Sequence, residues 1–146
     1  MIPALTNPTL ETFLSPETFI GATDHWVIVL RNKQVTLGSL ILITKHNVNA
    51  MADLPADAVT DLHNAWQKIA RLYDATFQPE KLNYLALMMV DTNPHFHVLP
   101  RYAAPRAFDG AFFDDKSWPK PPDLAQDTGL TPAQHAKLAE HLRAAI

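Results

Sequence analysis

The sequence predicts an α+β fold, because short runs of β-branched and aliphatic residues are interrupted by one long helical pattern and followed by a second helix. A chain of 146 residues that is 47% hydrophobic is long enough to bury one core. We therefore expect a single domain over residues 1–146.

The N-terminal half contains three candidate strands. Residues 8–20 read as a short helix or an irregular arm, and the first strand is predicted over 25–30. A polar turn follows, and a second strand is plausible at 35–37. Residues 39–44, rich in leucine and isoleucine, form the third.

The middle of the chain carries the long helix and two further strands. Its apolar residues recur at a one-sided helical spacing; they are Val59, Leu62, Trp66, Ile69, Ala70 and Tyr73. This spacing predicts a helix over residues 56–77, ending before Pro79. Strands are predicted over 82–90 and 95–101.

The C-terminal part is expected to pack rather than to hang free. Residues 101–124 are rich in proline and aromatic residues, which indicates a packed tail. Within the tail, Asp114 and Asp115 are adjacent like charges and are expected to face water. A closing helix is predicted to begin near Thr131, with Pro132 at its first position.

Composition narrows the classes of function. The formal net charge of −3 gives no support for general nucleic-acid binding, which usually requires a basic surface. There is no cysteine, so disulfides and thiolate metal sites are excluded. The N-terminus lacks the pattern of a secretory signal, and no apolar run is long enough for a bilayer. We expect a cytoplasmic protein with no membrane partner.

The most informative segment runs from Asn93 to Tyr102 and reads Asn-Pro-His-Phe-His-Val-Leu-Pro-Arg-Tyr. Alternate side chains of a strand share one face, so His95 and His97 should lie on one side, about 6–7 Å apart. Imidazole is the side chain best suited to act as a nucleophile or general acid near neutral pH. The segment therefore predicts a paired-histidine site with an apolar back.

This segment resembles the signature of the histidine triad (HIT) superfamily, His-φ-His-φ-His-φ-φ followed by Pro-Arg, where φ is apolar. Residues 95–101 match its last two histidines and its tail, while Asn93 fills the first histidine position. Residues 83–91 and 36–39 resemble a bacterial branch called diadenosine tetraphosphate hydrolase-like. The resemblance covers roughly residues 20–105.

The resemblance implies a five-stranded antiparallel sheet with a long helix and a C-terminal helix, usually in a homodimer. It implies nucleotidyl hydrolysis or transfer at an α-phosphorus, most readily on diadenosine tetraphosphate-type substrates. His95 would be the nucleophile, His97 would contact the leaving group or phosphate, and Asn93 would orient the site. Asn83, Arg101 and Lys45 are candidate substrate contacts, and neither a cofactor nor a metal is expected.

Three alternatives remain open at this point. Asn-Pro-His-x-His also resembles the galactose-1-phosphate uridylyltransferase branch, which would make His97 the nucleophile. Asn93, together with the lack of the family's Gly-Gln-Ser phosphate loop, is compatible with a catalytically weakened protein that only binds nucleotides. A metal-dependent hydrolase is the third reading, although two histidines are too few ligands for a protein metal site.

Overall fold

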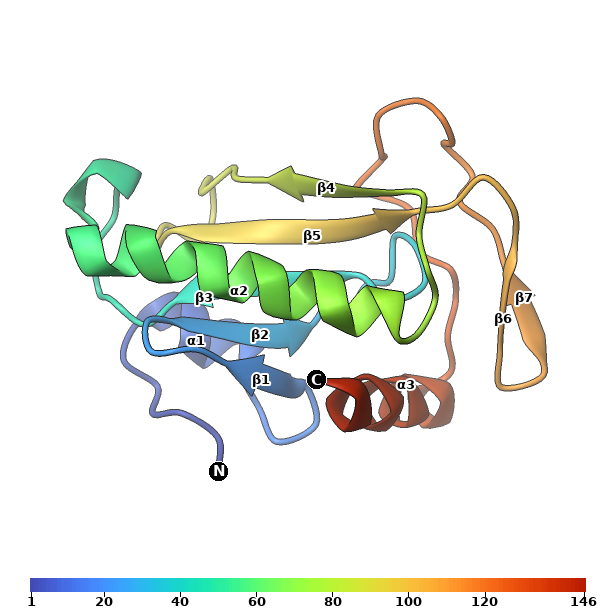
Figure 1. Cartoon of the computed structure of the whole chain (residues 1–146), viewed down its shortest axis with the longest axis horizontal. Helices are drawn as coiled ribbons and strands as arrows, with labels where there is room; N and C mark the ends of the chain where they lie inside the picture. The colour runs from blue at the N-terminus through green and yellow to red at the C-terminus, as the bar shows by residue number, and fades with distance from the viewer.

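The computed structural model describes all 146 residues and is built around one antiparallel sheet of five strands in the order β1-β2-β3-β5-β4 (Figure 1). The strands are β1 (Phe19–Ala22), β2 (Trp26–Leu30), β3 (Leu40–Thr44), β4 (Lys81–Leu85) and β5 (His95–Arg101). The predicted α+β class and five-stranded antiparallel sheet are confirmed. β4 and β1 form the two edges.

Helices cover both faces of this sheet. They are α1 (Pro8–Phe13), the 3₁₀ turn η1 (Met51–Asp53), α2 (Ala56–Asp74) and α3 (Pro132–Ala145). The long helix α2 runs across one face (Figure 1). Its buried residues, such as Leu62 and Ile69, join Ile28, Leu42 and other strand residues in the main core cluster. None of the helices has the length and apolar character needed to cross a membrane.

The opposite face has a smaller apolar cluster that α1 covers. Leu10 and Leu14 pack there against valines and isoleucines of β2 and β3, and Phe13 lies at the margin. Asn7 caps α1 by accepting the N–H of Leu10 at 2.9 Å. This cluster lies over β2 and β3 and contains no residue of β5, so the start of β5 lies beside the cluster.

Two strand predictions differ from the structure. Residues 35–37 do not form a strand, because the Gln34 side chain accepts the N–H groups of Gly38 and Ser39 and folds this segment into a buried loop. The fifth strand is instead β1, which overlaps the segment 8–20 predicted as a helix or arm only at Phe19 and Ile20. β4 ends at Leu85 rather than residue 90, and Met88 adopts a φ of 46°, which a strand cannot contain.

The C-terminal third adds a feature that was not predicted, a hairpin of β6 (Arg106–Phe108) and β7 (Ala111–Phe113). Its two-residue turn is Asp109-Gly110, both with positive φ. α3 begins at Pro132 as predicted, and Thr131 and Gln134 form a reciprocal capping box. α3 lies beside β1 (Figure 1).

Candidate active site

The two histidines of β5 lie on the sheet face that α1 partly covers. His95 pairs with Ile43 and His97 with Ile41 in the neighbouring β3, so both rings stand on the side of that isoleucine cluster. Their ring centroids are 5.3 Å apart. Phe96, between them, points to the other face, where its ring lies 5.9 Å from that of Trp26. The alternation predicted from the sequence is therefore present.

The tautomer of His95 is defined by its hydrogen bond. Nδ1 lies 2.7 Å from the main-chain oxygen of Asn93. A carbonyl oxygen can only accept, so Nδ1 carries the proton. In the neutral ring Nε2 then has a free lone pair, which is the requirement for a nucleophile or base. The residue is only 3% exposed, so its ring has little freedom to turn.

Asn93 itself is 1% exposed and is held by a complete set of hydrogen bonds. Its Oδ1 accepts the main-chain N–H and the hydroxyl of Thr9, at 3.1 and 2.9 Å. Its Nδ2 donates to the main-chain oxygen of Val48 at 2.8 Å and to Oδ1 of Asn47 at 3.3 Å. The carboxamide thus joins the start of α1 and the loop after β3, and it fixes the carbonyl that orients His95.

His97 has a different environment. Nε of Arg31 donates to its Nδ1 at 3.4 Å. Burial, then the charge of Arg31 and then that of His95 lower the pKa of His97 to about 4. The ring is therefore neutral near pH 7, and since Nδ1 accepts, the proton is on Nε2. His97 is a hydrogen-bond donor through Nε2, opposite in tautomer to His95.

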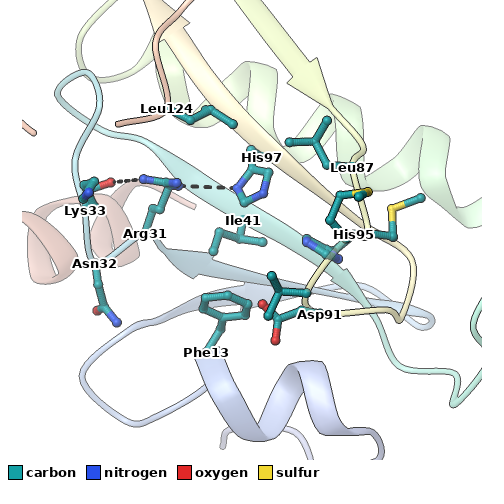
Figure 2. Close-up of a pocket in the computed structure, with 13 residues that line it drawn as sticks. Phe13, Arg31, Asn32, Lys33, Ile41, Leu87, Asp91, His95, His97 and Leu124 are labelled. Atoms are coloured by element: carbon teal, nitrogen blue, oxygen red, sulfur yellow. Dashed lines mark hydrogen bonds between the residues drawn. The ribbon is translucent and has the colours of Figure 1, made fainter. Parts of the chain in front are cut away.

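Both rings open onto a cavity of about 400 Å³ (Figure 2). Its wall is largely apolar around a few charged groups. The lining residues are Phe13, Arg31, Asn32, Lys33, Ile41, Leu87, Met88, Met89, Val90, Asp91, His95, His97 and Leu124. A mostly apolar cavity with a few convergent polar groups is the usual form of a small-molecule site.

The loop after β4 forms an apolar side of the cavity entrance. Met89 and Val90 are 84% and 91% exposed, which is unusual for side chains of this size. Asp91 is the carboxylate of this loop and lies in the cavity wall near Phe13 and His95 (Figure 2). The cations of the lining, Arg31 and Lys33, come from the other side, after β2.

The structure does not bring the three predicted substrate contacts into this cavity. Arg101 is 4% exposed and forms an ion pair with Asp115, with Nε 2.7 Å from the carboxylate. It also donates to Oδ1 of Asn83 at 2.8 Å. Nζ of Lys45 donates to the main-chain oxygen of Thr23 at 2.7 Å. Asn83 and Arg101 line a separate groove beside β4.

The ion pair also corrects an expectation about Asp115. Asp114 is exposed as predicted, but the side chain of Asp115 is only 2% exposed. Besides Arg101, it accepts the main-chain N–H of Tyr102 at 3.1 Å. The carboxylate of Asp115 can be buried because the guanidinium of Arg101 is buried beside it, and each neutralises the desolvated charge of the other.

Arg31 and Lys33 are the two cations of the cavity wall, and neither was predicted from the sequence as a site residue. Arg31 follows β2 and lies two residues after Val29, which pairs with Ile41 beneath His97. Side chains alternate between the two faces along a strand, so Arg31 falls on the same face as the histidines. Its place in the site could therefore have been predicted from the sequence. No group of three or more His, Asp or Glu side chains lies close enough together to hold a metal ion.

The family to which this chain belongs is shown by a match to a family model. The model of the HIT domain family matches residues 13–104, which include both histidines and all five strands of the sheet. The chain belongs to the HIT domain family. No curated protein sequence matches this HIT protein.

Solved HIT structures have the same fold. A histidine triad protein from Sinorhizobium meliloti is 21% identical, with a TM-score of 0.67, and the match covers 94% of this chain and 99% of that one. One from Bradyrhizobium japonicum is 18% identical, with a TM-score of 0.69 and 95% of each chain covered. A histidine triad protein from Marinobacter aquaeolei is 20% identical, with a TM-score of 0.68 and coverage of 86% and 85%.

This HIT protein departs from the triad pattern at one position. Asn93 stands where the signature has its first histidine, yet its main-chain oxygen still orients His95. Its carboxamide makes two contacts as an acceptor and two as a donor. A neutral imidazole has one donor and one acceptor nitrogen and could not replace all four. The asparagine is thus integrated into the packing of this site.

Proposed function

We propose that this protein is a nucleotidyl hydrolase or transferase that acts at the α-phosphorus of a nucleotide through a covalent intermediate on His95. The observation that carries the proposal is the 2.7 Å contact between Nδ1 of His95 and the Asn93 carbonyl. It leaves Nε2 unprotonated and directed to the cavity side of the strand. It also supports His95 rather than His97 as the nucleophile, because Nδ1 of His97 accepts from Arg31.

In the first step, the lone pair on Nε2 of His95 forms a bond to phosphorus, and the bond from phosphorus to the leaving group breaks. The leaving group takes the electron pair and then a proton from water, while the neutral His97 ring can stabilise its developing negative charge by donating a hydrogen bond from Nε2–H. The positive charge that develops on the His95 ring is stabilised by the Asn93 carbonyl through Nδ1–H.

In the second step, water or another acceptor attacks phosphorus and the bond to Nε2 breaks, returning the electron pair to His95. Attack by water releases a nucleoside monophosphate and a proton. Such phosphoryl chemistry depends mainly on positioning and charge stabilisation. The burial of His95 and the hydrogen bonds of Asn93 supply the positioning.

As the specific reaction, we propose hydrolysis of dinucleoside polyphosphates of the diadenosine tetraphosphate type. The support is the family membership and the positive charge of Arg31 and Lys33 in the cavity wall. Their guanidinium and ammonium groups can stabilise phosphate charge. One structural relative, a protein from Sulfolobus tokodaii that is 16% identical, is described as a hypothetical histidine triad nucleotide-binding protein.

Turnover and trapping test the proposal together. The wild-type protein is incubated with diadenosine tetraphosphate, an aminoacyl-adenylate and a nucleoside phosphoramidate, and products and intact-protein mass are recorded. We expect release of a nucleoside monophosphate and a nucleotidyl adduct on His95. His95→Gln should lose both, whereas His63→Gln, on the exposed face of α2, serves as the matched control and should keep both. Nucleotide binding without any product or adduct would instead identify a protein that only binds nucleotides.

We further propose that the protein forms a homodimer through the β4 edge. β4 pairs only with β5, so its outer main-chain groups are available for another strand. Trp66 beside it is 42% exposed and lies 6.2 Å from the ring of Tyr84. Sedimentation equilibrium should give twice the chain mass, and a monomer at high concentration would contradict this proposal. The cytoplasmic location stays a prediction from the sequence.

A further inference from the structure

Asp91 is the only acidic side chain among the residues that line the histidine cavity. It belongs to the loop between β4 and β5 and lies near Phe13 and His95 (Figure 2). The side chain is half-buried, and its carboxylate makes neither a hydrogen bond nor an ion pair with another residue of the chain. The carboxylate is therefore free to accept a hydrogen bond from a molecule in the cavity.

The two residues that follow Asp91 fix its place in the wall. The hydroxyl of Thr92 donates to Oδ1 of Asn49 in the loop after β3, at 2.9 Å. The side chain of Asn93 is buried and held by its four hydrogen bonds. Since the carbonyl of Asn93 also orients His95, the main chain at Asp91 has a defined position relative to the candidate nucleophile.

The second step of the proposed reaction needs a base, because the attacking water must lose a proton. His95 cannot accept this proton, since Nε2 is bonded to phosphorus in the intermediate and Nδ1–H donates to the Asn93 carbonyl. His97 cannot accept it either, since Nε2 already carries a proton and Nδ1 accepts from Arg31. Both imidazoles are thus occupied when the proton must leave.

The other polar groups of the cavity wall are no better suited. Arg31 and Lys33 are cations, and the carboxamide of Asn32 is not a base. Every remaining lining side chain except Asp91 is apolar. A carboxylate is one of the side chains that act as general bases, either in direct contact with the attacking water or through one bridging water.

We propose that Asp91 is the general base of the second step and takes the proton from the water that attacks phosphorus. The water oxygen forms a bond to phosphorus, and the bond from phosphorus to Nε2 of His95 breaks and returns its electron pair to the ring. The proton passes to the Asp91 carboxylate, which releases it to solvent. The inference rests on the proposed function and makes water the acceptor, so that the protein is a hydrolase rather than a nucleotidyl transferase.

Single-turnover kinetics measure the two steps separately. Excess protein is mixed with a nucleoside phosphoramidate, quenched in alkali to preserve the bond between phosphorus and histidine, and analysed by intact-protein mass. In Asp91→Asn, the adduct on His95 should form at a rate within about threefold of wild type. Its hydrolysis should slow by about 10²-fold or more, as for the loss of a general base, so the adduct should accumulate.

Asp114→Asn is the matched control, because Asp114 is exposed and lies outside the histidine cavity. It removes the same charge and should leave both rates within about twofold of wild type. Thermal melting of both variants checks folding, and Asp91→Asn should melt as wild type does because the carboxylate has no partner in the chain.

Two outcomes would overturn the inference and leave the proposed function in place. One is hydrolysis of the adduct in Asp91→Asn within about threefold of the wild-type rate. The other is an equal fall in the rates of formation and hydrolysis, which would assign Asp91 to substrate binding instead. A wild-type protein that forms neither product nor adduct would overturn the proposed function, and this inference with it.

Discussion

Thr9 donates both its main-chain N–H and its hydroxyl to the side-chain oxygen of Asn93, at 3.1 and 2.9 Å. The two residues are 84 positions apart and both are buried. The contact fixes the first turn of α1 against the residue whose carbonyl orients His95. Stability of the N-terminal segment and orientation of the candidate nucleophile therefore depend on the same side chain.

Replacing Asn93 by alanine should lower stability by about 1–3 kcal/mol. The substitution leaves the Thr9 N–H and the Val48 carbonyl buried without partners, and such groups carry the full cost of desolvation. Urea unfolding of wild type and Asn93→Ala measures the change. Asn32→Ala, at an exposed position, is a suitable control and should change stability by less than about 0.5 kcal/mol. An unchanged midpoint for Asn93→Ala would show that the carboxamide network contributes little.

Restoring the first histidine of the triad should not improve this protein. In Asn93→His, an imidazole would have to fit a buried space formed for a smaller carboxamide and would satisfy at most two of its four contacts. We expect lower stability and turnover no higher than that of wild type. The measurement is kcat/KM with a nucleoside phosphoramidate, together with the unfolding midpoint. A rise in turnover at unchanged stability would contradict this view of Asn93.

The low pKa of His97 should make stability depend on pH. The pKa is about 4 in the folded protein and about 6.5 in an unfolded chain, so the unfolded state takes up the proton first as pH falls. The contribution is complete above pH 6.5 and is lost as pH falls toward 4. Compared with His97→Gln, wild type should lose about 1–2 kcal/mol more between pH 7 and pH 5, allowing for the exposed part of the ring. Parallel pH dependence of the two proteins would contradict the assignment.

Removing the charge of Arg31 should raise the pKa of His97. Arg31 is the second of three causes that lower this pKa, after burial and before His95, so the value in Arg31→Gln should rise but stay below 6.5. NMR titration of the His97 ring protons in wild type and variant gives both values. Arg71→Gln should leave the titration unchanged. A fall or no change in Arg31→Gln would show that the guanidinium does not act on this ring.

The sequence predicts those parts of the fold that depend on regular patterns. The apolar spacing from Val59 to Tyr73 identifies α2, which ends at Asp74, three residues before the predicted end. The alternation around Phe96 correctly places the two histidines on one face. Such patterns are local, so they can be read without knowledge of distant neighbours.

The differences arise where side chains bond to main chain or to distant residues. Gln34 turns a β-like segment into a loop by bonding to Gly38 and Ser39, which strand propensity does not reveal. The hairpin at Asp109-Gly110 carries a standard turn signal and could have been predicted. By contrast, nothing in the sequence near Arg101 indicates that its partner is Asp115, because the pair forms only through the packing of the tail.

The last prediction concerns the ion pair between Arg101 and Asp115, which we expect to stabilise the fold without taking part in catalysis. Both side chains are buried, and removing one partner leaves the other charge uncompensated. Asp115→Asn and Arg101→Met should each lower stability by about 3–5 kcal/mol, whereas the double variant Arg101→Met with Asp115→Leu should lose less than the sum.

The same variants test whether Arg101 contacts substrate. It lies in the groove beside β4, outside the wall of the histidine cavity. At a temperature where the double variant is fully folded by circular dichroism, KM for a nucleoside phosphoramidate should therefore stay within about threefold of wild type. A large rise in KM with intact folding would instead support the substrate contact that was predicted for Arg101 from the sequence, and would place the substrate across both cavities.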